Sequence, residues 1–238
     1  MPAKLDAILW DFDGTLVNSN QKNIDTTKSI LSIVVPHLSG ENLPGFLRSE
    51  SAYHEANHAV DNWRGLYRDF CGLTEREIDQ AGSLWAEHQE KNGTQVPLFD
   101  GIDEVINRFC DVPHGICSQN ARQNIWDVLK LYRIDAPFRA VVGYDDLTGD
   151  TQKPHAAGGI MALADILGNT TDRCVMYIGD HEADVRFARN IQSTTGDGTR
   201  VIAVAVAYSG ARPDRWSVKA DHVANRVSEL GSIIGQYT

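Results

Sequence analysis

The sequence is short of the features that would place it in a specialised structural class. Only four of its 238 residues are cysteines, and none of them is spaced as CxxC. Because Cys110, Cys117 and Cys174 lie in apolar surroundings, we predict that they are buried free thiols, as expected in a reducing compartment. No apolar run approaches the roughly 20 residues of a membrane-spanning helix, so no membrane span is expected.

Basic residues are also scarce, which bears on the choice of partner. Lysine and arginine number 22 against 32 aspartates and glutamates, which gives a net charge of −10. Nucleic-acid backbones and anionic membrane surfaces repel an acidic chain, so we expect neither as the main partner. A phosphorylated small molecule needs only local positive charge. The N-terminus lacks the basic and long apolar segments of a secretory signal, so we expect a cytoplasmic protein.

Short apolar runs alternate with helical patterns over most of the chain. Strands are predicted at residues 5–10, 115–117, 140–143, 174–178, 201–206 and 222–223. Strands that alternate with helices form parallel sheets with right-handed crossovers. The predicted fold class is therefore α/β, with a parallel sheet.

The segment after the first strand has a different pattern. Helical periodicity dominates from about residue 19 to residue 92, and long stretches lack strand signals. The region 46–70 is predicted to be helical, with Gly65 as its break. Thr74 and Glu77 form a capping-box signature at the start of another helix. These patterns indicate a helical domain inserted into the α/β core.

The predicted boundaries place this helical domain at residues 19–95 and the α/β core at residues 1–18 and 96–238. Both ends of the insertion are tethered close to the first strand. A domain tethered in this way can close over the edge of the sheet and exclude water. We therefore expect a small substrate, with negligible action on phosphoproteins or nucleic acids.

Several polar residues follow the predicted strands. Asp11 and Asp13 come directly after the first strand, and Ser118 follows the strand at 115–117. The others lie in later loops or helix starts, namely Lys153, Asp180 and Asp184. Ligands bind at the C-terminal edge of the strands in α/β sheets, so we expect these side chains to converge there.

The chemistry of these residues is coherent. Clustered carboxylates repel one another unless a cation neutralises them, and oxygen ligands favour Mg²⁺ over Zn²⁺. Ser118 precedes a helix, so its hydroxyl and the following backbone N–H groups, beginning with that of Gln119, can hold an anion. Lys153 supplies a positive charge for a phosphoryl oxygen. A carboxylate nucleophile with these partners is what phosphoryl transfer through an aspartyl-phosphate requires.

The order of these motifs resembles that of the haloacid dehalogenase superfamily. The four stretches are DFDGT at residues 11–15, Ser118, Lys153-Pro154, and GDHEAD at residues 179–184. The helical insertion resembles the cap of the phosphoglycolate-phosphatase-like branch of that superfamily. The resemblance covers essentially the whole chain and implies a Rossmann-like parallel sheet with helices on both faces, plus a helical cap.

The resemblance also implies a role for each residue. Asp11 is expected to be the nucleophile and Asp13 the general acid and base. Ser118, Gln119 and Lys153 are expected to bind the phosphoryl group. The implied Mg²⁺ ligands are the Asp11 carboxylate, the Asp13 backbone carbonyl and Asp180, whereas Asp184 is expected to support the metal site or orient Lys153.

Asp13 favours a phosphatase within this superfamily. Dehalogenases lack a carboxylate at this position because a halide leaving group needs no proton, whereas an alkoxide does. The implied activity is Mg²⁺-dependent hydrolysis of small phosphate monoesters, with a small phosphorylated metabolite as the partner and a monomer or homodimer as the assembly. Asn18 departs from the aspartate usual in this branch, at the position that resembles the hinge into the cap.

Three other functions remain as alternatives at this stage. A phosphoglucomutase-like transferase would use the same aspartyl-phosphate but pass the phosphoryl group to a sugar. His54, Glu55 and His58 match the HExxH pattern of zinc peptidases, although the extended metzincin pattern is absent. A catalytically silent binding protein would not need four carboxylates. The aromatic residues of the insertion are expected to form mainly its core, namely Tyr53, Trp63, Tyr67 and Trp85.

Overall fold

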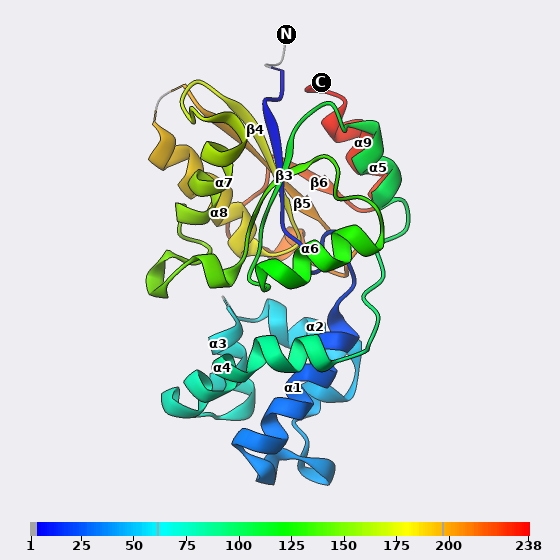
Figure 1. Ribbon diagram of the computed structural model, residues 1–238, viewed down its shortest axis with the longest axis vertical. Helices are drawn as coiled ribbons and strands as arrows, with labels where there is room; N and C mark the ends of the chain where they lie inside the picture. Colours follow the sequence, from blue (N-terminus) through cyan, green and yellow to red (C-terminus); the bar gives the residue numbers. More distant parts are fainter. Residues whose placement is uncertain (1–3, 61, 197) are drawn as a thin grey trace. The chain divides into compact units, whose positions relative to one another are not determined.

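The computed structural model describes residues 4–60, 62–196 and 198–238. In this part of the chain, parallel strands form one six-stranded sheet in the order β3-β2-β1-β4-β5-β6 (Figure 1). The strands are β1 (Ala7–Trp10), β2 (His114–Cys117), β3 (Phe138–Val142), β4 (Cys174–Gly179), β5 (Arg200–Val206) and β6 (His222–Ala224). The predicted α/β class with a parallel sheet is confirmed.

The central position of β1 places its C-terminal end between two other strand ends. All four residues of β1 are buried, as expected for a parallel strand that is covered on both faces. Trp10 lies opposite Ile116 of β2 and Ile178 of β4. Because the three strands run in register, the residues that follow them emerge at the same edge of the sheet.

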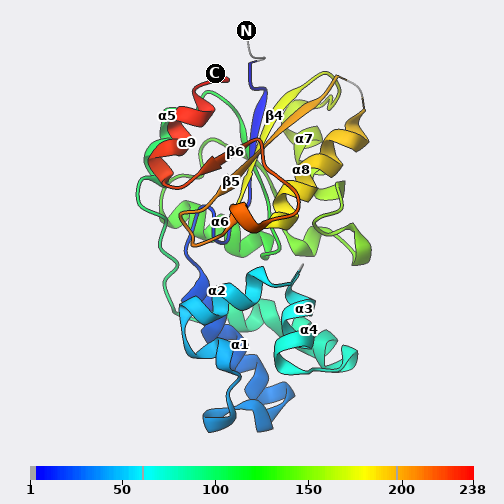
Figure 2. The same cartoon turned by 180° about the vertical axis from the view of Figure 1, so that it is seen from behind.

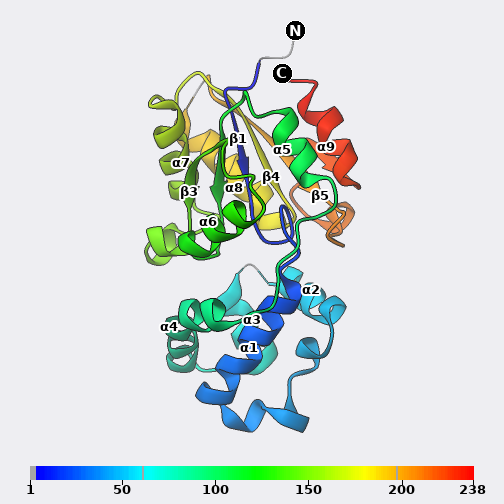
Figure 3. The same ribbon diagram turned by 45° about the vertical axis from the view of Figure 1, so that its right-hand side comes forward.

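Helices cover both faces of this sheet. Helices α7 and α8 pack on one face, whereas α5 and α9 lie side by side on the other (Figures 2 and 3). The α/β unit contains α5 (Ile102–Arg108), α6 (Arg122–Leu131), α7 (Ala157–Leu167), α8 (Glu182–Thr195), α9 (Val227–Ile234) and the short 3-10 helices η4 (Tyr144–Asp146), η5 (Gly149–Thr151) and η6 (Pro213–Arg215).

Strand alternation divides the core of this unit into two layers. Ala7 and Leu9 of β1 pack in the cluster that contains Tyr177 of β4 and Phe187 of α8. Trp10 points to the opposite face, where its indole stacks on His114 of β2. Mainly apolar side chains therefore hold the sheet on both faces, and His114, which is hydrogen-bonded to Trp10, is a buried polar exception.

The chain separates into two compact units, one formed by Met1–Asn18 with Leu98–Thr238 and the other by Ser19–Pro97. The second unit consists of α1 (Asn20–Val34), η1 (Pro36–Leu38), η2 (Gly40–Asn42), η3 (Gly45–Arg48), α2 (Glu50–His58), α3 (Trp63–Cys71) and α4 (Glu75–Lys91). Its core contains Tyr53 and Tyr67, and Trp63 and Trp85 pack against it, as predicted.

The helix starts in this unit follow local sequence signals. The Thr74 backbone N–H donates to Glu77 at 2.8 Å, and the Thr74 hydroxyl accepts from the Glu77 N–H at 3.4 Å, which confirms the capping box. The predicted break at Gly65 is wrong. Helix α2 ends at His58 and α3 begins at Trp63, because the Asn62 side chain caps α3 by accepting from the Gly65 N–H at 3.1 Å.

The prediction for the cysteines is correct for two of the three named. Cys117 and Cys174 are buried and free, whereas Cys110 is exposed because it lies in the turn that follows α5. Among the described residues, no helix combines the length and the apolar composition needed to cross a bilayer.

Candidate active site

Asp11 extends β1 by one residue into the sheet edge. Its backbone N–H donates to the Ile178 carbonyl at 2.8 Å, so the ladder between β1 and β4 still holds the chain at this point. The chain then turns away, with the Gly14 N–H donating to the Val17 carbonyl at 2.9 Å and Gly14 at a φ of +75°. Asp11 itself is buried.

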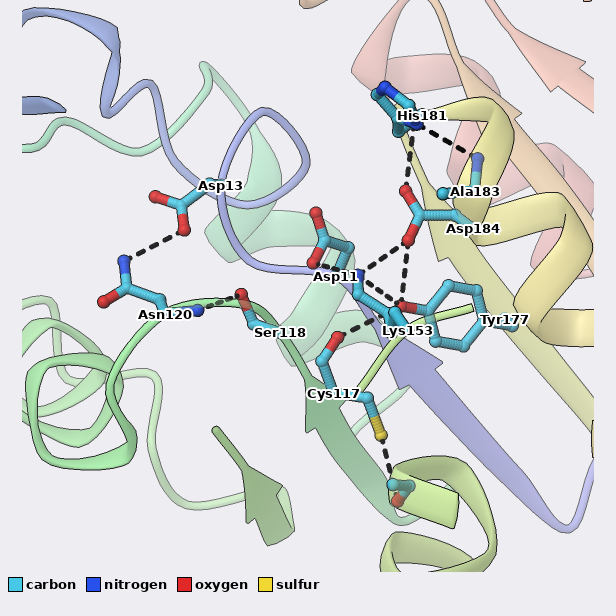
Figure 4. A network of polar contacts seen from close by, with 11 residues as sticks. Asp11, Asp13, Cys117, Ser118, Asn120, Lys153, Tyr177, His181, Ala183 and Asp184 are labelled. Carbon is cyan, nitrogen blue, oxygen red and sulfur yellow. Dashed lines mark hydrogen bonds and ion pairs between the residues drawn. The ribbon is translucent and has the colours of Figure 1, made fainter. Parts of the chain in front are cut away.

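The ammonium group of Lys153 lies at the centre of a buried polar network (Figure 4). It donates to Asp11 Oδ1 at 2.7 Å, to Asp184 Oδ1 at 2.7 Å and to the Tyr177 hydroxyl at 3.1 Å. An ammonium has three N–H groups, and these contacts use all of them. Burial alone would lower the pKa of Lys153, but the adjacent Asp11 and Asp184 outweigh it and raise the pKa, so the lysine is charged.

Asp184 is fixed by the first turn of α8. Its Oδ2 atom accepts from the backbone N–H of His181 at 3.0 Å, and this carboxylate is almost completely buried. A side chain at Gly179 would overlap it, which explains why the residue that ends β4 has no Cβ. The Tyr177 hydroxyl lies 3.1 Å from the Cys117 carbonyl and 3.2 Å from Asp184 Oδ1.

Three carboxylates lie close together at this edge of the sheet, and two of them contact Lys153. The ligand atoms of Asp11, Asp180 and Asp184 all lie within 4.8 Å of one another, and all three residues are buried. Burial raises the pKa of Asp11 well above its ordinary range, Lys153 opposes this shift, and Asp184 and Asp180 add to it. If all three carboxylates are ionised, they carry more negative charge than one lysine neutralises, and a dication would correct this imbalance.

The geometry around Asp180 fits such a cation. A side chain at Gly14 would overlap the Asp180 carboxylate, so the glycine is what lets the turn after β1 approach Asp180. Oxygen-only donor sets suit hard ions that keep several waters, such as Mg²⁺. The residues present therefore fit a magnesium site.

Ser118 and Gln119 begin the loop between β2 and α6. The Ser118 N–H donates to the Val142 carbonyl at 3.0 Å, which fixes the loop against β3. Ser118, Gln119 and Lys153 line one small cavity, with room for about one water molecule, together with polar residues such as Gln152 and apolar residues such as Phe187. The structure thus brings the three predicted phosphate-binding residues to a common space.

Asp13 lies beside the same loop. Its Oδ2 atom accepts from the side-chain amide of Asn120 at 2.9 Å, and its carboxylate points toward Asn120 in Figure 4. The Asn120 backbone N–H in turn donates to the Ser118 hydroxyl at 3.2 Å. Asp13 is therefore connected to Ser118 through one residue.

Two members of this arrangement were missed from the sequence. Tyr177 has the pattern of a core residue in the apolar run of β4, although a buried tyrosine hydroxyl usually needs a partner. Asn120 has the pattern of an ordinary loop residue, and only its position two residues after Ser118 could have drawn attention to it.

The HExxH pattern lies in the helical unit. His54 and His58 share one face of α2, with ring centroids 4.1 Å apart, as predicted for this spacing. In the described residues of that unit, no third His, Cys, Asp or Glu ligand atom lies close enough to form a three-ligand group with them. The pair is therefore not a complete zinc site within its own unit.

Comparison with known proteins agrees with the site. A sequence model of the haloacid dehalogenase-like hydrolase family matches residues 8–196, which include all four motifs. The chain belongs to this family. It is an enzyme of the hydrolase class, and the resemblance inferred from the motifs is confirmed.

Several relatives match along almost their whole length. The pyrophosphatase PpaX of Listeria monocytogenes serotype 4a (strain HCC23) is 26% identical over 242 residues, which cover 98% of each chain. The pyrophosphatase PpaX of Bacillus velezensis is 26% identical over 235 residues, or 98% of this chain and 97% of the relative.

Solved structures show the same fold. A predicted phosphatase from Clostridium acetobutylicum superposes with a TM-score of 0.74 at 18% identity, covering 98% of this chain and 100% of the other. A predicted phosphoglycolate phosphatase from Haemophilus somnus 129PT gives a TM-score of 0.70 at 18% identity, with 96% and 97% covered.

Proposed function

We propose that the enzyme is a Mg²⁺-dependent phosphatase that hydrolyses small phosphate monoesters through an aspartyl-phosphate on Asp11. The contact of Lys153 Nζ with Asp11 Oδ1 at 2.7 Å carries this proposal. It places a buried carboxylate beside a fixed positive charge at the sheet edge where α/β proteins bind ligands. A buried carboxylate is shielded from water and can act as a nucleophile toward phosphorus. The adjacent Lys153 then offsets the negative charge of the phosphoryl group.

The two steps follow from the residues around Asp11. An Asp11 carboxylate oxygen bonds to phosphorus while the bond from phosphorus to the leaving oxygen breaks, and Asp13 gives that oxygen a proton. Water then attacks the phosphorus, Asp13 takes its proton, and Asp11 leaves as a carboxylate. Proton donation by a positioned acid assists most when the leaving group is an alkoxide.

The phosphoryl oxygens would be bound by Ser118, Gln119 and Lys153, which line one cavity. The three N–H groups of Lys153 are already used by Asp11, Asp184 and Tyr177. Binding of a phosphoryl oxygen therefore exchanges one of these contacts. Tyr177 is suited to release the lysine, because its hydroxyl also lies within hydrogen-bond distance of the Cys117 carbonyl.

The Asp11 carboxylate, the Asp13 backbone carbonyl and Asp180 would hold the magnesium ion, which supplies positive charge next to the phosphoryl oxygens. The buried cluster of Asp11, Asp180 and Asp184 supports this assignment. Asp184 contacts Lys153 at 2.7 Å, so we assign it to the orientation of the lysine.

The helical insertion is proposed to act as a cap over the substrate. In this proposal residues 19–95 form the cap domain, and residues 1–18 with 96–238 form the catalytic core. The chain enters the insertion only a few residues after Asp13, which supports a role close to the catalytic step. A cap of this kind selects small phosphorylated metabolites over folded phosphoproteins.

A phosphate-release screen tests the function directly. The purified enzyme is assayed with Mg²⁺ or with EDTA on alkyl phosphates, sugar phosphates, p-nitrophenyl phosphate and a folded phosphoprotein. Inorganic pyrophosphate is included because the relatives are named pyrophosphatases. We expect Mg²⁺-dependent release from small substrates, and no release after Asp11→Asn. Isomerisation of a sugar phosphate without phosphate release would instead identify a mutase.

A further inference from the structure

The side chain of Asn120 has an orientation that its neighbours determine. Its Oδ1 atom accepts from the Ala121 backbone N–H at 2.8 Å and from the Asn124 side-chain amide at 3.1 Å. Two donors on one atom identify that atom as the oxygen, so the amide nitrogen must occupy the other position. The Asn120 Nδ2 atom therefore faces Asp13 for a structural reason.

The rest of Asn120 is fixed as well. Its backbone N–H donates to the Ser118 hydroxyl at 3.2 Å, and its carbonyl accepts from the Tyr144 N–H at 3.1 Å. Only 3% of the residue is exposed. A buried amide that is held at every polar atom can impose its geometry on a half-buried partner such as Asp13.

We propose that Asn120 is a positioning residue for the general acid and base, Asp13, an inference that rests on the proposed phosphatase function. The Asn120 amide donates to Asp13 Oδ2 at 2.9 Å (Figure 4). An amide N–H donates and never accepts, so Oδ2 is kept as the acceptor oxygen. The Oδ1 atom is the oxygen that carries the proton in the reaction.

The proton transfer then has a defined direction. The O–H bond at Asp13 Oδ1 breaks as the leaving oxygen takes its proton. The bond between phosphorus and that oxygen breaks at the same time, and its electron pair stays on the oxygen. Without Asn120 the carboxylate can rotate, and the oxygen that exchanges the proton is no longer held in place. Small losses of alignment in a catalytic group lower the rate strongly.

A purely structural role for the same hydrogen bond predicts a different result. If Asn120 only tied the turn after β1 to the loop after β2, its loss would slow all substrates by a similar factor. If it positions the acid, the loss depends on how much the leaving group needs a proton. The two roles are therefore separated by comparing an alkyl phosphate with p-nitrophenyl phosphate, whose phenolate leaves without assistance.

The test uses Asn120→Ala and the isosteric Asn120→Asp, which replaces the donor with a charged acceptor. For Asn120→Ala, we compare kcat/KM, which covers only the steps up to departure of the leaving group and not the later attack by water that both substrates share. We expect kcat/KM to fall by about tenfold to a hundredfold on the alkyl phosphate and by less than about threefold on p-nitrophenyl phosphate. Asn120→Asp should show a larger difference between the losses on the two substrates. Two carboxylates then face each other, and the hydrogen bond that positions Asp13 is lost. Gln123→Ala is the matched control, since Gln123 lies three residues after Asn120 in the first turn of α6 and bonds to Asp127 at 2.8 Å on the exposed surface.

Each outcome decides the question. Equal losses on both substrates, or faster turnover of the alkyl phosphate, would overturn the positioning role while leaving the proposed function intact. If Asn120→Ala does not fold, Asn124→Ala replaces it as the test variant, because it removes one of the two donors that orient Asn120. The alkyl phosphate should again lose more activity than p-nitrophenyl phosphate, but by a smaller factor. A wild-type enzyme that releases no phosphate from any substrate would overturn the proposed function and this inference with it.

Discussion

The Lys153 ammonium lies 2.7 Å from Asp11 Oδ1, although the two residues are 142 positions apart in the chain. Their side chains are only 8% and 10% exposed. An ion pair this deeply buried loses most of its hydration. It therefore stabilises the folded state only while each charge keeps its partner. The end of β1 and the loop before α7 are therefore coupled by charge as well as by packing.

Replacement of Lys153 by Met should destabilise the protein in a cation-dependent way. The change leaves the carboxylates of Asp11, Asp180 and Asp184 clustered with no lysine among them. We expect the free energy of unfolding to fall by about 3–5 kcal/mol in EDTA. Because a bound cation stabilises the folded state by mass action, Mg²⁺ should restore part of the loss. Urea unfolding at several Mg²⁺ concentrations measures both effects.

The control for that variant is Lys91→Met. Lys91 pairs with Glu87 on the surface of α4 with 70% of its side chain exposed. Its loss should change stability by less than about 1 kcal/mol, with no response to Mg²⁺. Similar behaviour of the two variants would show that the Lys153 network is not a charge-balanced site.

Asp11→Asn should abolish turnover while the fold survives. The amide occupies nearly the same volume, and Lys153 keeps its contact with Asp184, but the proposed nucleophilic oxygen and proposed metal ligand are lost. We expect kcat to fall by at least about a thousandfold. Circular dichroism and a steady-state phosphate assay check the two halves of this prediction. Turnover within about tenfold of the wild type would rule out Asp11 as the nucleophile.

Asp13→Asn should lower activity most on substrates whose leaving group needs a proton. The amide keeps a side chain of the same shape beside Asn120 but cannot give up a proton to the leaving oxygen. We expect a loss of about a hundredfold or more on an alkyl phosphate and a much smaller loss on p-nitrophenyl phosphate. The measurement is the ratio of the two kcat/KM values. An unchanged ratio would argue against Asp13 as the acid.

The parts of this site that are predictable from the sequence are those that depend on local pattern. Asp11 and Asp180 each follow a short apolar run that favours a buried strand, and parallel strands bring their C-terminal ends together. The positions of these carboxylates therefore follow from element order alone. The capping box at Thr74 is predictable for the same reason, since all its atoms lie within one turn of helix.

Other features depend on tertiary register and could not be inferred from the sequence. Tyr177 becomes a polar contact only because β4 directs its hydroxyl toward Lys153, which comes from a distant loop. Asn120 contacts Asp13 across 107 positions of the chain. The break between α2 and α3 was misplaced because Asn62 caps α3, a role that short polar residues share with many ordinary surface positions.

His114 should make the protein less stable in mild acid. It is buried in β2, where Nδ1 accepts from the Trp10 indole N–H at 3.0 Å and Nε2 donates to the Phe109 carbonyl at 3.1 Å. Phe138 packs edge-on against the ring. Burial lowers the pKa of His114 from 6.5 to about 4, although the Phe109 contact opposes this shift. The neutral ring is therefore the native form.

The sign of the pH effect follows from the lowered pKa. Above pH 6.5 His114 is neutral in both states, and below that pH only the unfolded state takes up the proton until about pH 4. Stability should fall across this window, by about 2 kcal/mol from this residue between pH 8 and pH 5. His114→Phe has no group to titrate, so its urea-unfolding free energy should decline less steeply with acid. The same decline in both proteins would contradict the prediction.

Gly14→Ala should damage both stability and the response to Mg²⁺, because the position has two separate constraints. Its φ of +75° lies in the left-handed region, and any Cβ there would overlap the Asp180 carboxylate. Gly72, the C-cap of α3, has a similar φ of +68° but open space where a Cβ would lie, so Gly72→Ala isolates the cost of backbone strain.

We expect Gly72→Ala to lower the free energy of unfolding by about 1 kcal/mol. Gly14→Ala should cost roughly 2–4 kcal/mol and weaken the Mg²⁺ stabilisation by displacing Asp180. If the two variants lose equal stability and respond equally to Mg²⁺, the close approach of the turn to Asp180 has no part in building the site.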